Sequence, residues 1–259
     1  GLISGNGQLV QRGTGTLTIN GANTYSGGTL LEGGAVLLSA NAASSAALGS
    51  GTVNVTGNTT LRTVASSTVV QRALGNAFTL QSGATLSVDA SGTNGTLSLN
   101  GAISGNGHLA ITSAATTAVI MAGDVNITGT TTVLASSTLQ IGNGGTTGTL
   151  ASASVSLASG AILRFNRSDA SNFNSAVSGI GALEKIGAGS LTVGGKLSHT
   201  GTTTVSAGSL VASAAQVMSA VSNTTVNTGA TLDLNGLSQT LGSMAGGGTV
   251  QTGADARTV

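Results

Sequence analysis

Residues 183–210 read LEKIGAGSLTVGGKLSHTGTTTVSAGSL, and this stretch decides the fold. Residues 9–36, LVQRGTGTLTINGANTYSGGTLLEGGAV, repeat it in phase, with apolar residues, glycines and hydroxyl-bearing residues at matching positions. Both copies contain a short alternation of apolar and polar residues, Leu17-Thr18-Ile19 in the first and Leu191-Thr192-Val193 in the second. A period of two that is bounded by glycine predicts a strand with one buried face.

The same alternation recurs along the chain, as in Val53-Asn54-Val55, Leu86-Ser87-Val88, Leu97-Ser98-Leu99, Val155-Ser156-Leu157 and Leu232-Asp233-Leu234. A second motif, Ile-Ser-Gly-Asn-Gly at residues 3–7, returns at residues 103–107 and in altered form at residues 177–181. Internal repetition of this kind is typical of solenoids. The chain, residues 1–259, is therefore predicted to be a single β-helix segment with repeat-like units near residues 1–40, 101–142, 161–213 and 229–250.

Short strands without long connections can pair in parallel only if the chain winds as a coil. Three strands of about five residues and turns of about two need roughly 20 residues, which is close to the spacing of the alternations. We therefore expect an all-β fold, a right-handed parallel β-helix (β-solenoid) of about a dozen coils, because parallel crossovers are nearly always right-handed. At ~4.8 Å for each coil the rod would be on the order of 60 Å long.

The composition agrees with a narrow coil and excludes several classes of protein. There are 42 Gly, no Pro and no Cys, and only 6% of residues are charged, whereas 39% are hydrophobic. Proline would remove a donor from the hydrogen-bond ladder, and tryptophan would not fit the narrow interior. The net charge of +1 and the scattered basic residues argue against nucleic-acid binding. No apolar run reaches the ~20 residues of a membrane span, so the chain is not expected to be membrane-spanning.

Several motifs resemble the passenger-associated repeat of bacterial autotransporters. They are residues 13–29, Phe165-Asn166-Arg167-Ser168-Asp169, Val177-Ser178-Gly179, Leu183-Glu184-Lys185 and residues 187–193. The resemblance implies type V secretion through the periplasm and outer membrane to the bacterial cell surface. It also implies a separate C-terminal β-barrel translocator, which we expect to lie outside this sequence. Family members are often adhesins, self-associating factors or biofilm proteins, so the partners implied are host or bacterial surface molecules or the protein itself.

One segment brings charge and aromatic residues together, and it supplies the candidate ligand-binding residues Arg164, Phe165, Arg167, Asp169 and Phe173. In a functional interpretation this segment is a ligand loop in which Phe165 or Phe173 stacks on a sugar. In a structural interpretation Phe165 fills a wider coil and Arg167 pairs with Asp169 at a turn. We favour the structural interpretation.

Catalytic and metal sites are not predicted. The carboxylates are mostly far apart in the sequence, at Glu32, Asp89, Asp124, Asp169, Glu184, Asp233 and Asp255. Asp169 and Glu184 could meet across adjacent coils as an acid/base pair, although ion pairs with Arg164, Arg167 or Lys185 are the stronger expectation. His108 and His199 occupy non-equivalent repeat positions, so we expect solvent-facing turn residues and no bound metal. The family's tyrosine is present as Tyr25, but Ile127 and His199 replace it in the other copies, so no chemistry can depend on it.

These observations predict a structural and adhesive β-helical stalk that mediates surface attachment, self-association or biofilm formation, with no cofactor and no enzymatic activity. A second hypothesis is a module that assists folding and translocation and binds no ligand. A glycan-active β-helix enzyme is the lesser alternative, which would require clustered carboxylates.

Overall fold

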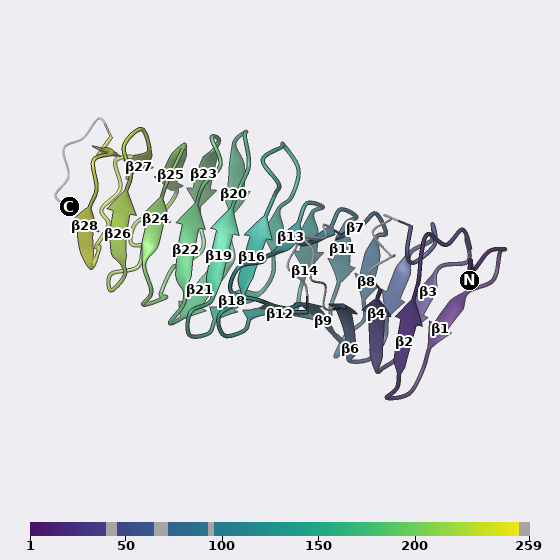
Figure 1. Cartoon of the computed structure of the whole chain (residues 1–259). Coiled ribbons are helices and arrows are strands. Elements are labelled where there is room, and N and C mark those ends of the chain that lie inside the picture. Colours follow the sequence, from purple (N-terminus) through teal and green to yellow (C-terminus); the bar gives the residue numbers. More distant parts are fainter. Residues whose placement is uncertain (40–45, 65–71, 93–95, 254–259) are drawn as a thin grey trace.

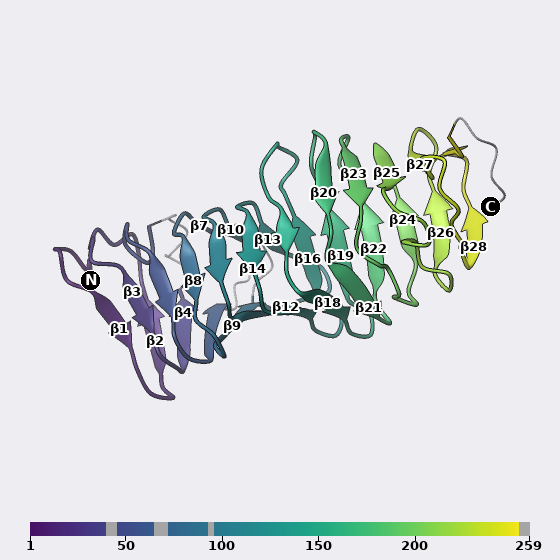
Figure 2. The same cartoon turned by 180° about the vertical axis from the view of Figure 1, so that it is seen from behind.

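The computed structural model describes residues 1–39, 46–64, 72–92 and 96–253, which form an elongated stack of strands (Figure 1). The two ends of the chain lie at opposite ends of the stack, as the reverse view also shows (Figure 2). All regular elements in the described residues are β-strands, and every strand pair is parallel. The prediction of an all-β parallel solenoid is confirmed, with about ten turns where about a dozen coils were expected.

The strands belong to four sheets, which we name A to D. Sheet A contains β1 (Leu9–Gln11), β3 (Thr29–Leu31), β5 (Val53–Val55), β8 (Phe78–Leu80), β11 (Ile103–Gly105), β14 (Val125–Ile127) and β17 (Leu150–Ala151). Sheet B contains β2 (Thr16–Ile19), β4 (Ala35–Leu38), β6 (Thr59–Thr63), β9 (Thr85–Ala90), β12 (His108–Ser113), β15 (Thr131–Val133), β18 (Ser154–Leu157) and β21 (Ala176–Gly179).

The other two sheets extend to the C-terminal turns. Sheet C contains β7 (Arg72–Leu74), β10 (Leu97–Leu99), β13 (Val119–Met121), β16 (Thr138–Ile141), β19 (Ile162–Phe165), β22 (Ala182–Lys185), β24 (Thr203–Val205), β26 (Asn223–Val226) and β28 (Ser243–Ala245). Sheet D contains β20 (Ser171–Phe173), β23 (Ser190–Val193), β25 (Ser209–Ala212), β27 (Thr231–Asp233) and β29 (Thr249–Gln251). From β19 to β22 the chain passes through sheets C, D, B and C in turn. Sheet D therefore follows sheet C along the chain, as sheet A does in earlier turns.

Each strand pairs with the strand one turn further along the chain, so side chains stack in columns through the interior. In sheet C one such column contains Leu97, Val119, Leu139, Leu163 and Leu183, and each of these side chains is fully buried. Aliphatic side chains fill this column because the coil is narrow and each residue must pack on its counterparts above and below. The interior is one continuous hydrophobic cluster.

The two most similar sequence copies lie in different sheets. In the first copy the leading strands β1 and β2 belong to sheets A and B, whereas the equivalent strands β22 and β23 belong to sheets C and D. The same residues therefore form the same local strand-turn-strand unit on different sides of the solenoid. This is possible because every side of the coil requires the same element, a short strand with one apolar face.

Candidate functional site

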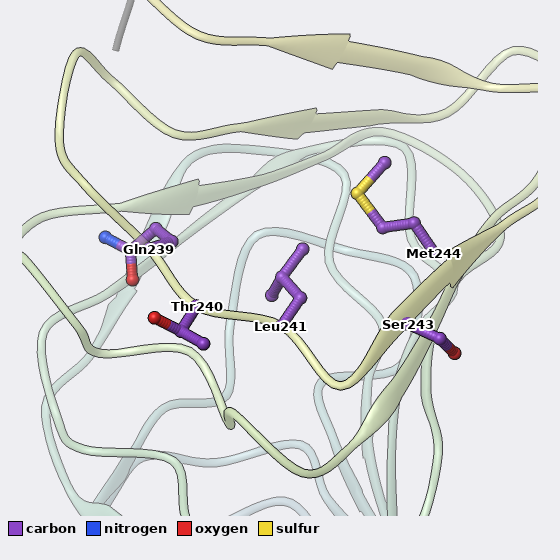
Figure 3. A pocket seen from close by; sticks show the side chains of 5 residues that line it. All are labelled: Gln239, Thr240, Leu241, Ser243 and Met244. Carbon is purple, nitrogen blue, oxygen red and sulfur yellow. The ribbon is translucent and has the colours of Figure 1, made fainter. Parts of the chain in front are cut away.

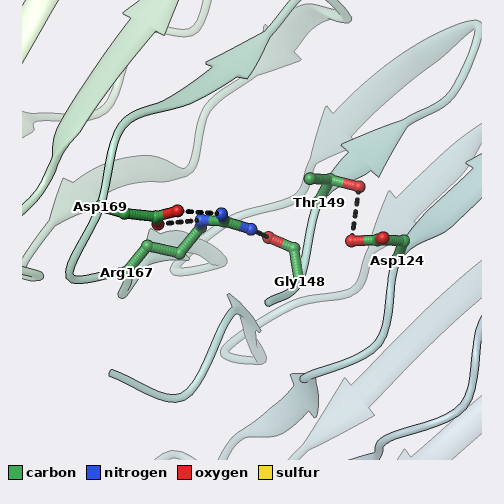
Figure 4. Close-up of polar contacts among 5 residues, drawn as sticks. All are labelled: Asp124, Gly148, Thr149, Arg167 and Asp169. Carbon is green, nitrogen blue, oxygen red and sulfur yellow. Dashed lines mark hydrogen bonds and ion pairs between the residues drawn. The ribbon is translucent and has the colours of Figure 1, made fainter. Parts of the chain in front are cut away.

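The segment that carries the candidate residues forms an ion-paired turn. The Arg167 guanidinium donates two hydrogen bonds to the Asp169 carboxylate, from Nε at 2.9 Å and from Nη2 at 2.8 Å (Figure 4). Its Nη1 donates to the backbone carbonyl of Gly148 at 2.9 Å, in the loop between β16 and β17. The hydrogen bond from Arg167 and its positive charge lower the pKa of Asp169. Arg167 thus joins its own turn to a loop of the preceding coil, as a structural residue would.

The two phenylalanines of this segment lie in the core. Phe165 is 3% exposed and Phe173 is 1% exposed, and their ring centroids lie 4.9 Å apart with the planes tilted by 58°. Tilted aromatic pairs at this distance are favourable packing arrangements. The interpretation in which either ring stacks on a sugar is wrong, because neither ring presents a face to solvent.

Arg164 and Glu184 point outward from adjacent strands of sheet C and form an ion pair of 2.7 Å between Nε and Oε2. Asp169 and Glu184 are therefore each paired with a different arginine. Lys185, a further predicted partner for these carboxylates, points inward instead and is 2% exposed. Its Nζ donates to the carbonyls of Gly187 and Ala207, and burial lowers its pKa.

The remaining described carboxylates also have structural partners. Glu32 pairs with Arg12, and Asp124 accepts a hydrogen bond from Thr149 at 3.0 Å (Figure 4). Asp89 caps the amide of Ser91 and Asp233 caps that of Asn235, both at 2.8 Å. Asp255 lies outside the described residues. Within the described part of the chain no three histidine or acidic side chains lie close enough together to hold a metal ion.

The two histidines differ in their surroundings. His108 lies on the surface of sheet B, where its Nδ1 accepts a hydrogen bond from the Thr130 amide at 3.0 Å. His199 was expected to face solvent, and this expectation is wrong, since the side chain is fully buried. Its Nε2 lies 3.0 Å from Thr203 Oγ1, and burial lowers its pKa to about 4.

His199 occupies the repeat position of Tyr25, whose hydroxyl lies 2.6 Å from Thr29 Oγ1. Both side chains turn into the coil and hydrogen-bond the threonine four residues later. The position is therefore a polar packing site within the coil. The repeat alignment places the two residues at one position, and the structure shows that both are buried.

One cavity lies at the last turns of the solenoid and is lined by Gln239, Thr240, Leu241, Ser243 and Met244 (Figure 3). Its volume is about 340 Å³. The Gln239 amide is already engaged, because Nε2 donates to the Ala214 carbonyl at 2.7 Å and Oε1 accepts from the Met218 amide at 3.1 Å. None of the five lining side chains is titratable, so the cavity lacks the groups of a catalytic site.

A second recess lies on the outer face of sheet C and was not predicted from the sequence. It is lined by Thr96, Ser98, Asn100, Ile120, Gln140, Asn143 and Asn166, together with Arg72 and Ala73. These residues share no motif, and only the stacking of successive coils brings them together.

None of the described segments forms a helix that could span a membrane.

Comparisons with known proteins agree with this architecture. Two segments, residues 9–38 and 183–212, match the family model described as the passenger-associated-transport-repeat. The chain is 36% identical over 240 residues to the adhesin BmaC autotransporter of Brucella suis biovar 1 (strain 1330). The match covers 91% of this chain and 6% of that relative. No solved structure gives a significant match. The two transport repeats and the similarity along most of the sequence identify this chain as an autotransporter passenger sequence.

Proposed function

We propose that the chain is an adhesive stalk exposed at the bacterial cell surface, where it mediates attachment or self-association. Similarity over 91% of the chain to a protein named as an adhesin is the observation that carries this proposal. In addition, the six described carboxylates are each held by a structural partner, which favours a binding or structural role over catalysis.

The outer face of sheet B is the surface best suited to lateral contacts. Its register places Ser87, Ala110, Thr132, Ser156 and Ser178 in one outward column across five strands. All five side chains are small and uncharged, so a partner can approach the sheet closely over a long distance. Many weak hydrogen bonds to hydroxyl groups along such a column can add up to a stable contact.

The test is display of the chain on the surface of a non-adherent bacterium, followed by measurement of clumping and of attachment to surfaces and host cells. The variant Thr132→Glu/Ser156→Glu/Ser178→Glu should abolish clumping, because like charges on the sheet B faces of neighbouring copies repel each other. A matched control places three glutamates on outward positions of sheet D, at Asn172, Thr192 and Val211. If the displayed chain causes neither clumping nor attachment, the adhesive function is wrong.

A second candidate is a module that assists folding during translocation and binds nothing, and the match of two segments to a transport repeat favours it. Deletion of residues 183–202 removes one turn within a matched repeat, because Leu183 pairs with Thr203. Deletion of residues 103–124 removes one turn outside both matches, because Ile103 pairs with Val125. If this candidate holds, the first deletion in the full-length protein should block surface delivery far more than the second, as measured by protease accessibility on intact cells.

A further inference from the structure

The outer face of sheet C contains a groove whose floor is sunk below its surroundings. The register places Ser98, Ile120 and Gln140 in one outward column on β10, β13 and β16. Although they point away from the core, they are only 9%, 7% and 6% exposed. Later members of the same column, Glu184 and Thr204, are half-buried. The three central strands therefore form a recessed floor.

Two walls border this floor. One wall contains Thr96 and residues 115–118, and the other contains Asn100, Asn143 and Asn166. Two cavities of about 340 Å³ and 260 Å³ lie between the walls, and they share Thr96, Ile120 and Gln140. They therefore form one continuous groove, and its size falls in the range of known ligand sites, roughly 300–1,000 Å³.

The wall that carries Asn143 is held firmly in place. Asn143 belongs to the loop between β16 and β17, where the Gly144 amide donates to the Asn166 carbonyl at 2.9 Å. The Arg167 guanidinium fixes the same loop through the Gly148 carbonyl and is itself fixed by Asp169 (Figure 4). The ion-paired turn singled out by the sequence therefore supports one side of the groove, and a preorganised wall lowers the entropic cost of binding.

The polar groups of the groove are amides and hydroxyls with spare hydrogen-bonding capacity. Gln140 Nε2 donates to the Gly142 carbonyl at 2.9 Å, which leaves its Oε1 as an acceptor. Ser98 Oγ donates to Asn100 Oδ1 at 2.6 Å, which leaves the Asn100 amide hydrogens as donors. Within the described residues the side chains of Asn143 and Asn166 make no hydrogen bond. Primary amides present donors and an acceptor together, which suits neighbouring hydroxyl groups on a ligand.

The groove exposes little charge. The residues lining both cavities include no carboxylate. Arg164, at one end, is paired with Glu184, and Arg72 occupies the inward register of Leu97 and is 1% exposed. A groove with little exposed charge, amide walls and an apolar floor at Ile120 fits a ligand that is rich in hydroxyls, carries no charge and has one apolar face. Sugar rings have this combination of properties.

We propose that this groove binds a neutral oligosaccharide, with the Asn143, Asn166 and Gln140 amides contacting hydroxyl groups and Ile120 lying against a ring face. The inference rests on the proposed adhesive function and deepens it, because it adds a ligand class and a site for attachment on sheet C, separate from the sheet B face proposed for self-association. The sugar chain would run across β10, β13 and β16, parallel to the axis of the solenoid.

The test is isothermal titration calorimetry of the purified chain with neutral hexasaccharides built from glucose or N-acetylglucosamine, and with hexagalacturonate as the charged probe. We expect binding of at least one neutral hexasaccharide at micromolar to millimolar concentration and weaker binding of the acidic one. The double variant Asn143→Ala/Asn166→Ala should weaken binding at least tenfold. Asn172→Ala, an exposed asparagine on sheet D, is the matched control and should change binding less than twofold.

Far-UV circular dichroism of each variant verifies that the solenoid is intact. Three outcomes would overturn the proposal: no neutral hexasaccharide binds at millimolar concentration, the acidic probe binds as tightly as the neutral ones, or the groove and control variants behave alike. The two proposals fail separately. Adhesion of the displayed chain without sugar binding rejects the groove alone, whereas sugar binding without adhesion rejects the adhesive function alone.

Discussion

At the residue scale, one repeat position shows how the coil accommodates polar groups. Tyr25 and His199 each hydrogen-bond the threonine four residues later, Thr29 or Thr203. In the middle copy Ile127 takes this position and can make no such bond. Thr131 Oγ1 is consequently buried without a hydrogen-bond partner in the described structure. The repeat thus tolerates different residues at this position. The effect of each on stability depends on whether it can form a hydrogen bond with the threonine.

The first prediction concerns pH. The folded-state pKa of His199 is about 4 and its ordinary value is 6.5, so the unfolded chain binds a proton at a higher pH than the folded chain does. The contribution of His199 is therefore fully present above pH 6.5 and is lost as the pH falls towards 4. The loss amounts to at most about 3 kcal/mol. Urea unfolding at several pH values measures it.

His199→Tyr is the control for this prediction, because tyrosine occupies the equivalent position at residue 25. The variant removes the titrating group and should make the free energy of unfolding nearly constant between pH 6.5 and pH 4.5. An equally steep pH dependence in the variant would assign the effect to other groups.

The second prediction concerns the unpartnered hydroxyl. Thr131 lies in an inward column between Leu109 and Val155, so Thr131→Val should fit and should raise the free energy of unfolding by about 1 kcal/mol. At the equivalent position Thr203→Val breaks contacts with His199 and with Ser222 Oγ at 2.9 Å. That variant should lower the free energy of unfolding by about 1–2 kcal/mol. Urea titrations of both variants compare them directly, and equal destabilisation would contradict the assignment.

At the scale of the strand-turn unit, close stacking of coils decides which residues the turns accept. A Cβ atom on Gly189 would lie 1.9 Å from the Asp169 carbonyl oxygen in the preceding coil. A Cβ atom on the equivalent Gly15 would have no other atom within 4 Å. The two glycines share a repeat position, and within the described residues only Gly189 has a preceding coil stacked against it.

The third prediction follows from this difference. Gly189→Ala forces the turn away from the coil below and should destabilise the chain by about 1–3 kcal/mol. Gly15→Ala meets no obstruction and should change stability by less than about 1 kcal/mol. Thermal unfolding followed by circular dichroism tests both, and a large loss from Gly15→Ala would show that local backbone conformation, rather than stacking, requires glycine at this position.

At the scale of the whole molecule, stability depends on backbone ladders and a continuous aliphatic interior, while charge has a small part. The net charge is +1, and the described residues contain three side-chain ion pairs, Arg12–Glu32, Arg164–Glu184 and Arg167–Asp169. All three retain access to solvent on at least one partner, and such pairs contribute about 0–1 kcal/mol each.

The fourth prediction is therefore a weak dependence of stability on salt. Raising sodium chloride from about 0.05 M to about 0.5 M screens surface charges, yet it should shift the melting temperature by less than about 4 °C. Differential scanning calorimetry at the two concentrations measures the shift. A much larger decrease with salt would mean that electrostatic contacts between coils hold the solenoid together.

The candidate segment around Arg167 could be predicted only in part. The pairing of Arg167 with Asp169 and the packing role of Phe165 follow from the sequence, because the residues are neighbours and the coil interior must be filled. The burial of His199 was not predicted, because a polar residue in a glycine-rich sequence is typical of a solvent-facing turn. Its alignment with Tyr25 indicates burial only once Tyr25 is known to be buried. The inward turn of Lys185 likewise depends on the carbonyls of Gly187 and Ala207, which neighbouring turns supply.

The sequence by itself determined the strands, the parallel coil and the aliphatic interior, because alternation, glycine-bounded turns and repetition are local properties of the chain. Only the tertiary structure decided which side of the solenoid each repeat occupies, as β1 and β2 lie in sheets A and B but β22 and β23 in C and D. It also decided where a groove forms, because Ser98, Ile120 and Gln140 are separated by unequal numbers of residues and show no periodic pattern in the sequence. Turns of variable length set these spacings, and only stacking of the coils brings the three residues into one column.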